Sequence, residues 1–330
     1  MERTLYIFSK GRLVRKGNTL GFETAAGTRY VPVEAVRDIL VFGEVEFNKR
    51  LVEFLSQHEI LLHYFSHFGY YMGTFYPREH YNSGYVILRQ ASTYLNEATR
   101  MALAREFVRG SLKNMGKVVA YYNRRGVDLA EPLNELHAME PMIDAAPSIP
   151  ELMGVEGKVR LRYYATWDHI IADDDFKFDT RSKRPPQNRI NALLSFLNSL
   201  LYTTVLSEIY KTHLDPRIGF LHETNFRRFS LNLDIAEIFK PIIVDRLLFT
   251  LLGRRMIKPT DFRQDGAGVF LREQALKCIV EEYEKRLRTT IKARKLRRHV
   301  SYRRLIRLEL YKVQKYITGD EPYEPYVSEW

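Results

Sequence analysis

The spacing of apolar residues changes near residue 80, and this change constrains the fold more than any other feature of the chain. Before it, short β-branched and aromatic runs such as TLYIFS, TRYVPV and DILVFGEVEF alternate with SKG, KGN and AAG turns, a pattern typical of strands. After the turn formers of PREHYNSG, apolar residues recur every three or four positions, the period of half-buried helices. The sequence therefore predicts an α+β protein with a small, mostly-β N-terminal domain at 1–80, a linker at 81–90 and a larger all-α helical domain at 91–330.

Individual helices can be predicted from caps and faces. NKRLVEFLSQH, with Asn48 as N-cap, is predicted to be a helix inside the β domain. The stretch from Gln90 to Gly126 is predicted to be one long helix or a kinked pair, with the glycine at its C-terminal cap. RINALLSFLNSLLYTTVLSEIYKTHL is apolar on every face, which predicts the central helix of the second domain. We also expect a helix over 270–299.

Composition limits the cellular setting. The 330 residues, 45% of them apolar, suffice for two buried cores. MERTLYIFSKG has too short an apolar run for a signal peptide, and no uninterrupted 18-residue apolar stretch follows. We therefore expect a cytoplasmic protein with no membrane contact. Cys278 is the only cysteine, which excludes an intramolecular disulfide and a cysteine zinc cluster.

Positive charge is concentrated in one segment. The chain carries a net charge of +11, and the segment 285–307 contains eleven Lys and Arg among 23 residues with no acid. Such a run favours a polyanion, because neutralising phosphates releases counterions, although a solvated helix face is the plain alternative. The predicted DNA contacts are Lys292, Arg294, Lys295, Arg297, Arg298, Arg303 and Arg304.

The stretch IGFLHETNFRRFSLNLDIAE contains a potential metal site. His222 is followed by Asp234 and Glu237, which share one face at the start of a predicted helix. One imidazole with carboxylates suits Mg²⁺ or Mn²⁺ better than zinc. The same three residues also fit a core histidine and a helix cap, and spacing alone does not decide between these alternatives. Nucleotide-binding and nucleophile-elbow motifs are absent from the sequence.

Three stretches together resemble the CRISPR-associated spacer-acquisition integrase, the endonuclease family that founds the adaptation module. They are LMGVEGKVRLRYY at 152–164, RPPQNRINALLSFLNSLLYTTV at 184–205 and LDPRIGFLHETNFRRFSLNLDIAEIFKPIIVDR at 214–246. The similarity extends over nearly the whole chain, and the three motifs in this order are highly specific. The resemblance implies a β domain that forms a homodimer and a helical domain that holds one divalent ion.

The resemblance also implies a ligand set. The glutamate of the x-E-G motif, the histidine that ends G-F-x-H and an acid in the first turn of the next helix correspond to Glu156, His222 and Glu237. Asp234 is the alternative third ligand, or a group that supports the ligands. The metal is expected to orient a phosphodiester for attack by a 3′-hydroxyl, with positioning and charge stabilisation providing most of the catalysis.

The resulting hypothesis is a metal-dependent DNA endonuclease and integrase that inserts new spacers into CRISPR arrays. Its expected partners are double-stranded DNA, both the incoming fragment and the repeat array, and the second CRISPR-associated protein, a small dimer that bridges two integrase dimers. The alternative is a non-catalytic, basic DNA-binding protein with an architectural role. Metal dependence distinguishes the two hypotheses, whereas the salt dependence of DNA binding is expected under both.

Overall fold

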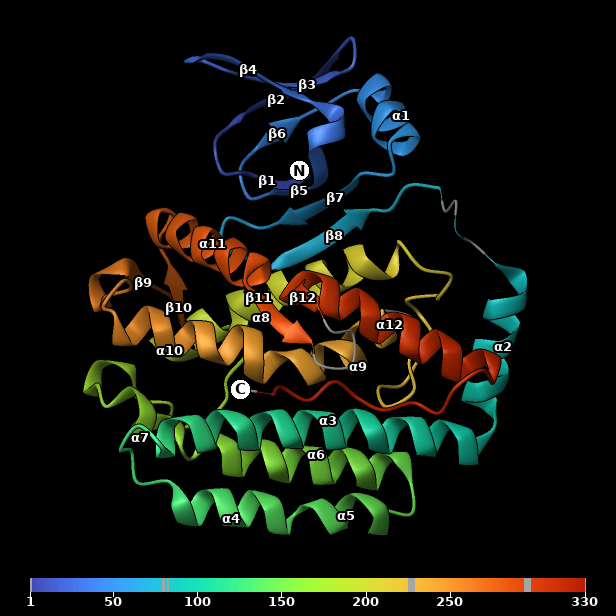
Figure 1. Cartoon of the computed structure of the whole chain (residues 1–330). Helices are drawn as coiled ribbons and strands as arrows, with labels where there is room; N and C mark the ends of the chain where they lie inside the picture. The colour runs from blue at the N-terminus through green and yellow to red at the C-terminus, as the bar shows by residue number, and fades with distance from the viewer. Residues whose placement is uncertain (1, 79–80, 82, 225–228, 294–297, 330) are drawn as a thin grey trace. The chain divides into compact units, whose positions relative to one another are not determined.

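The computed structural model describes residues 2–78, 81, 83–224, 229–293 and 298–329. The chain divides into two compact units, Met1–His80 with Leu271–Val280, and Tyr81–Phe270 with Glu281–Trp330. Strands dominate the start of the chain and helices the remainder (Figure 1). The predicted α+β class is therefore confirmed, while the placement of Leu271–Val280 in the first unit was not indicated by the sequence.

Within residues 2–78, the first unit contains two four-stranded sheets and the helix α1. Its elements are β1 (Arg3–Ile7), β2 (Gly11–Lys16), β3 (Thr19–Thr24), β4 (Gly27–Pro32), β5 (Val36–Val41), β6 (Val45–Glu46), α1 (Lys49–Gln57), β7 (Leu61–Phe65) and β8 (Tyr71–Phe75). One sheet has the order β1-β5-β7-β8 and the other β4-β3-β2-β6. The central strand β5 pairs in parallel with β1 and β7, and such strands are buried on both faces. Helix α1 starts at the predicted cap, where the Asn48 side chain accepts a hydrogen bond from the N–H of Leu51.

The second unit consists mainly of helices. They are α2 (Gly84–Leu95), α3 (Glu97–Asn123), α4 (Ala130–Ala138), α5 (Glu140–Ala145), α6 (Ile149–Tyr164), α7 (Trp167–Ile171), α8 (Arg189–Ile209), α9 (Ser230–Phe239), α10 (Arg246–Gly253), α11 (Glu273–Arg288), whose first part belongs to the first unit, and α12 (Tyr302–Thr318). Helix α3 contacts α4, α6 and α9 (Figure 1). Among the described helices, α8 alone is long and apolar enough to cross a membrane, yet 83% of its most apolar stretch is buried inside the protein. It is the predicted central helix.

Three expectations require correction. The linker predicted at 81–90 is already helical from Gly84, because Ser83 caps α2 by accepting a hydrogen bond from the N–H of Val86. The unit expected to be all-α also contains the strands β9 (Phe262–Asp265) and β10 (Gly268–Leu271), and β11 (Thr290–Ala293) and β12 (Arg298–Ser301), arranged as two pairs.

The helix predicted over 270–299 ends at Arg288 and gives way to β11. Three consecutive β-branched residues, Thr289, Thr290 and Ile291, follow, and such residues favour extended backbone over helix. The kinked-pair alternative for the Gln90–Gly126 stretch is the correct one, since α2 and α3 meet at Asn96.

Candidate metal centre

The loop at 214–222 carries the candidate histidine and is fixed by three helices. Gln90 of α2 donates to two carbonyl groups of the loop, at 3.0 and 2.7 Å. Arg100 of α3 donates from Nε to the carbonyl of Phe220 at 2.9 Å. A Cβ at Gly219 would lie 2.7 Å from the backbone of α9, so only glycine permits this close approach. The position of the histidine is therefore determined by buried backbone contacts.

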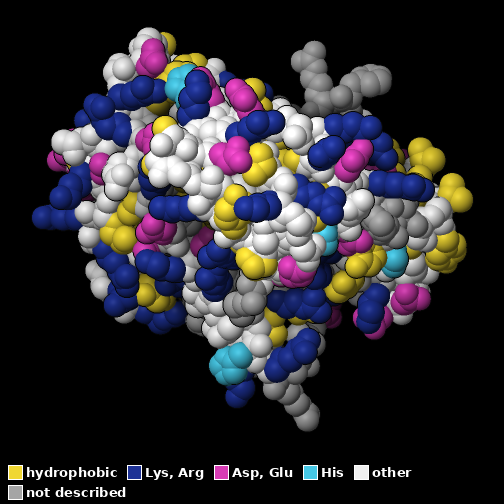
Figure 2. Space-filling view, turned by 90° about the horizontal axis from the view of Figure 1, so that it is seen from above, with side chains coloured by type: hydrophobic (Ala, Val, Ile, Leu, Met, Phe, Trp, Pro, Cys, Tyr) yellow, Lys and Arg dark blue, Asp and Glu magenta, His cyan; other side chains and the backbone are white. Residues whose placement is uncertain are grey.

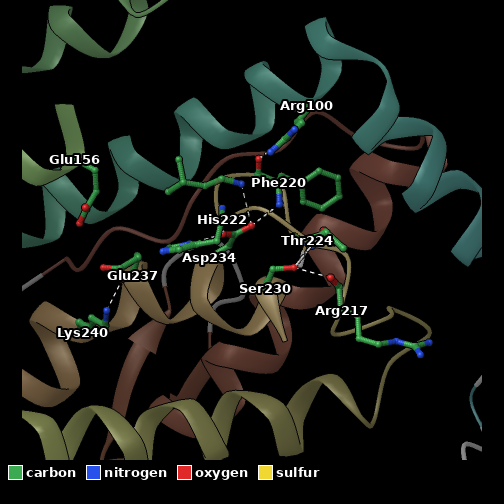
Figure 3. Close-up of polar contacts among 12 residues, drawn as sticks. Arg100, Glu156, Arg217, Phe220, His222, Thr224, Ser230, Asp234, Glu237 and Lys240 are labelled. Atoms are coloured by element: carbon green, nitrogen blue, oxygen red, sulfur yellow. Dashed lines mark hydrogen bonds and ion pairs between the residues drawn. The ribbon is translucent and has the colours of Figure 1, made fainter. Parts of the chain in front are cut away.

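Asp234 connects this loop to α9 (Figure 3). Its Oδ2 accepts hydrogen bonds from the N–H groups of Phe220 at 2.5 Å and Leu221 at 3.1 Å. Its Oδ1 accepts from the N–H of His222 at 2.9 Å and faces the imidazole Nδ1 at 2.8 Å. Because an ionised carboxylate only accepts, Nδ1 carries a proton, and in the neutral ring Nε2 keeps its lone pair. Asp234 is fully buried and thereby sets both the orientation and the tautomer of the ring.

The charge balance at His222 follows from this contact. Burial lowers the pKa of the imidazole, but the hydrogen bond and the charge of Asp234 outweigh burial, and the net shift is upward. Glu237 raises the same pKa further, which places its carboxylate within electrostatic range of the ring. A histidine whose ring is oriented by a carboxylate is the usual arrangement of a histidine that binds a metal ion.

Glu237 lies one turn beyond Asp234 on α9, and cations contact both of its carboxylate oxygens. Lys240 contacts Oε1, and Nη2 of Arg160 contacts Oε2. Burial opposes ionisation of Glu237, but Lys240 and Arg160 hold its pKa at about 2. Glu237 is therefore an anion at neutral pH.

Glu156 reaches the same place from α6. Ser148 caps this helix, and the buried side chains of Leu152, Val155, Val159 and Tyr163 fix its inner face. Glu156 borders that face, and its Oε1 accepts from Nε of Arg160 at 3.2 Å and from Nη2 at 3.1 Å. The same Nη2 contacts Glu237, so one positive group bridges carboxylates from two helices. Figure 3 shows Glu156, His222 and Glu237 pointing toward one another from α6, the loop and α9.

These donors fit a hard divalent cation. Two carboxylates already share one cationic nitrogen, and an oriented imidazole lies beside them, which is the oxygen-rich set that Mg²⁺ and Mn²⁺ accept. In the arrangement of the described residues, no three His, Cys, Asp or Glu side chains are gathered closely enough to hold an ion. The guanidinium of Arg160 takes the position between the two carboxylates.

A third buried carboxyl, that of Asp245, lies near Arg160. Asp245 ends a π-helical turn at Lys240–Asp245, and its buried carboxyl lies beside the hydroxyl of Tyr163. Burial raises the pKa of Asp245 to about 7, against the opposing charge of Arg160. π-Helical turns often occur at functional sites, and this one carries Lys240 toward Glu237.

Comparison with known proteins identifies the family. The model of the family described as CRISPR associated protein Cas1 matches residues 5–285. The chain belongs to the Cas1 family.

Relatives and solved structures agree with this assignment. The CRISPR-associated endonuclease Cas1 2 of Thermodesulfovibrio yellowstonii is 53% identical over 330 residues, the full length of both chains. A solved Cas1 structure from Thermotoga maritima is 46% identical, with a TM-score of 0.88 over 99% of this chain and 100% of that one. A casposase bound to its integration product shares the fold at 18% identity, with a TM-score of 0.89 over 99% and 94% of the two chains. The predictions of the family and of a CRISPR-associated nuclease are thus confirmed.

Within this Cas1 chain, the two candidates for the third ligand have different surroundings. Both oxygens of Asp234 accept hydrogen bonds from the loop, four in all, and two of these come from the N–H and the Nδ1 of His222. Glu237 faces Arg160, Lys240 and the imidazole. Arg160 and Lys240 were not predicted as site residues, although Arg160 lies four residues after Glu156 and Lys240 three after Glu237.

The residues predicted to contact DNA differ in their exposure to solvent. Lys292, Arg298 and Arg304 are exposed, whereas Arg294, Lys295 and Arg297 lie outside the described residues. The prediction of a DNA contact at Arg303 requires correction, because its side chain is buried on the inner face of α12 and donates to Glu284 at 2.9 Å.

Positive charge is also present elsewhere on this Cas1 chain. On the face shown in Figure 2, Lys and Arg side chains are widely spread with Asp and Glu among them. The whole chain carries 51 Lys and Arg against 40 Asp and Glu. Exposure of Lys292, Arg298 and Arg304 is therefore a necessary condition for DNA contact, but it does not distinguish them from other surface cations.

Proposed function

We propose that this chain is a divalent-metal-dependent DNA endonuclease and integrase that inserts new spacers into CRISPR arrays. Glu156, His222 and Glu237 would hold one Mg²⁺ or Mn²⁺ ion, and Asp234 would support the histidine. The observation that carries the proposal is the histidine, oriented by a buried carboxylate, next to two carboxylates that already share a cation. Full-length relatives named endonucleases support the reaction class.

A bound ion would polarise a phosphoryl oxygen and lower the pKa of an attacking hydroxyl. The chain's own residues prepare for this chemistry in three ways. Asp234 holds the His222 ring in a fixed orientation, and Glu237 remains ionised at neutral pH because Lys240 and Arg160 stabilise its charge. Hydrogen bonds from Gln90 and Arg100 hold the loop that carries the histidine.

In the transfer itself, the oxygen of a 3′-hydroxyl forms a bond to phosphorus and its proton is lost to solvent. The 3′-oxygen of the target strand leaves and takes up a proton from solvent, so that the number of phosphodiester bonds is unchanged. With water in place of the hydroxyl, the same displacement is strand cleavage.

DNA would reach this site along the exposed cations. Lys292, Arg298 and Arg304 would contact backbone phosphates and provide affinity without sequence preference. Both the incoming fragment and the repeat array are double-stranded DNA. The assembly we propose is a homodimer formed through the β unit, joined by the second CRISPR-associated protein, in the cytoplasm.

Metal-dependent strand transfer tests the proposal. His222→Ala should lower Mn²⁺-dependent cleavage and strand transfer by more than about 100-fold, above the loss typical for a residue that only supports a metal ligand, while DNA affinity changes little. His169→Ala, an exposed histidine on α7, is the control and should remain active. Undiminished Mn²⁺-dependent activity in His222→Ala would overturn the metal site.

The alternative function, a non-catalytic architectural protein that binds DNA, makes a different prediction. Under it, DNA binding depends on salt but Mn²⁺ changes neither binding nor DNA integrity. Titrating Mn²⁺ against the wild-type protein with a nicked and an intact duplex therefore separates the two functions before any variant is made.

A further inference from the structure

Arg160 occupies a position that the proposed ion would need. Its guanidinium donates to Glu156 Oε1 from both Nε and Nη2, and Nη2 also contacts Glu237 Oε2. Its side chain is only 12% exposed and that of Glu237 only 8% exposed. Lys240 contacts the remaining oxygen of Glu237. Both candidate carboxylate ligands are thus already neutralised by cations that belong to the chain.

The contacts of Arg160 exclude a direct addition of a divalent ion to this arrangement. A cation that binds Glu156 and Glu237 together would lie next to a guanidinium that already holds the same two groups, and like charges at such separations repel strongly in a buried site. Either the ion stays out or the guanidinium leaves.

We propose that Arg160 is a built-in counter-cation of the metal centre: it holds Glu156 and Glu237 together in the metal-free protein and is displaced when a divalent ion binds. The inference rests on the proposed function, because it assumes that these carboxylates are metal ligands. It makes Arg160 a positioning residue rather than a ligand.

The displaced guanidinium has a natural acceptor in the substrate. Arg181 and Lys183 also lie within electrostatic range of Arg160 or Glu237, and the described hydrogen bonds of Arg181 go only to neutral oxygens, those of Ser182, Asn191 and Ser195. The positive side chains around the site therefore outnumber the two carboxylates of Glu156 and Glu237. A DNA phosphate can accept two parallel hydrogen bonds from an arginine guanidinium. Because metal binding would release the guanidinium for this contact, metal binding and DNA binding should favour each other.

Mn²⁺ affinity of the metal-stripped protein, measured by calorimetry and by the EPR signal of free Mn²⁺, tests the inference without any DNA. Arg160→Gln removes the competing cation and should tighten Mn²⁺ binding about tenfold, which corresponds to about 1.4 kcal/mol. Arg160→Lys keeps the positive charge but loses the several N–H donors of the guanidinium. Its Mn²⁺ affinity should lie between those of Arg160→Gln and the wild type. Arg162→Gln, on the same helix and paired with Glu135, should match wild type.

The possible outcomes distinguish a failure of the counter-cation proposal from a failure of the proposed function. Unchanged or weaker Mn²⁺ binding in Arg160→Gln, with wild-type binding that depends on His222, would overturn the counter-cation and leave the metal site intact. Absence of Mn²⁺ binding by the wild type, or equal binding by His222→Ala, would overturn the proposed function itself.

A measurement on the wild type covers the case in which Arg160→Gln fails to fold. The Nε–H resonance of Arg160, assigned by its loss in Arg160→Lys, should shift when diamagnetic Mg²⁺ is added, because the guanidinium leaves the two carboxylates. The Nε–H resonance of Arg109, which is paired with Glu106, Glu140 and Asp144 on α3 and α5, should not move. A static Arg160 resonance at saturating Mg²⁺ would contradict the displacement.

Discussion

The candidate metal centre and the basic segment at 285–307 are both rich in charge, but they differ in how each charge is used. At the metal centre, Asp234 and Glu237 are buried, and the described structure provides a donor for all of their oxygens. In the basic segment, Lys292 and Arg298 are exposed. Composition identifies both regions, but only burial and partners show which charges maintain the fold and which are available to a ligand.

The largest loss of stability should come from removing Asp234, the buried carboxylate that accepts four hydrogen bonds at the candidate metal centre. Asp234→Ala leaves three backbone N–H groups and one imidazole N–H of the loop without their acceptor, and each unsatisfied buried donor costs about 1–3 kcal/mol. We expect a loss of about 4 kcal/mol or more in the free energy of unfolding, measured by urea denaturation. Asp261→Ala, at a half-buried residue that accepts from one backbone N–H, is the control. A loss below about 1 kcal/mol would show that Asp234 does not organise the loop.

The second test uses neighbouring arginines in the basic segment. Arg303 is buried against Glu284 and Glu208, and breaking a buried pair costs about 3–5 kcal/mol. Arg304, the next residue, is exposed, and its replacement should cost less than about 0.5 kcal/mol. Thermal and urea unfolding of Arg303→Ala and Arg304→Ala should therefore differ clearly. Equal stabilities of Arg303→Ala and Arg304→Ala would contradict the distinction between a charge that maintains the fold and a charge that is exposed for a ligand.

The third test is the pH dependence that Asp245 causes behind the metal centre. Burial raises the pKa of Asp245 to about 7 from 3.8, so its contribution to stability is complete below pH 3.8 and is lost as the pH rises to about 7. Between pH 5 and pH 8 the wild type should lose about 2–3 kcal/mol more than Asp245→Asn, since one pKa unit corresponds to about 1.36 kcal/mol. Parallel pH profiles of the two proteins would contradict a buried, protonated Asp245.

The smallest effect per residue is expected at the exposed cations. Changing Lys292, Arg298 and Arg304 to Glu should lower affinity for unrelated duplexes equally, and each lost phosphate contact should reduce the salt slope by about 0.9. Charge reversal at Lys49 and Arg50, exposed on α1, is the control. A loss confined to one DNA sequence would indicate base contacts instead of phosphate contacts.

The periodicity of apolar residues and the helix-capping residues were sufficient to predict most of the fold. The Asn48 cap, the buried α8 and the change from strands to helices are local properties of the sequence. The start of α2 at Gly84 was hidden because the turn formers around it resemble a linker. The antiparallel pair of β11 and β12 was not predicted, because the run of Lys and Arg around it is compatible with both helices and strands.

The candidate site could be predicted only in part. Residue type and the family resemblance led to Glu156, His222 and Glu237, but the separate role of Asp234 depends on hydrogen bonds to a loop twelve residues away along the chain. Arg160 and Lys240 appear in the sequence as ordinary helix-surface cations. The contact of Arg160 with Glu237 exists only because α6 and α9 are packed in one unit, whereas Lys240 contacts Glu237 from three residues further along the chain.

The most direct test of the central claim is anomalous diffraction from a crystal soaked in Mn²⁺. The account predicts one peak in each helical unit, bound by Glu156, His222 Nε2 and Glu237, with Asp234 still hydrogen-bonded to Nδ1 and Arg160 turned away from both glutamates. A peak bound by Asp234 in place of Glu237, or no peak beside His222 at saturating Mn²⁺, would contradict it.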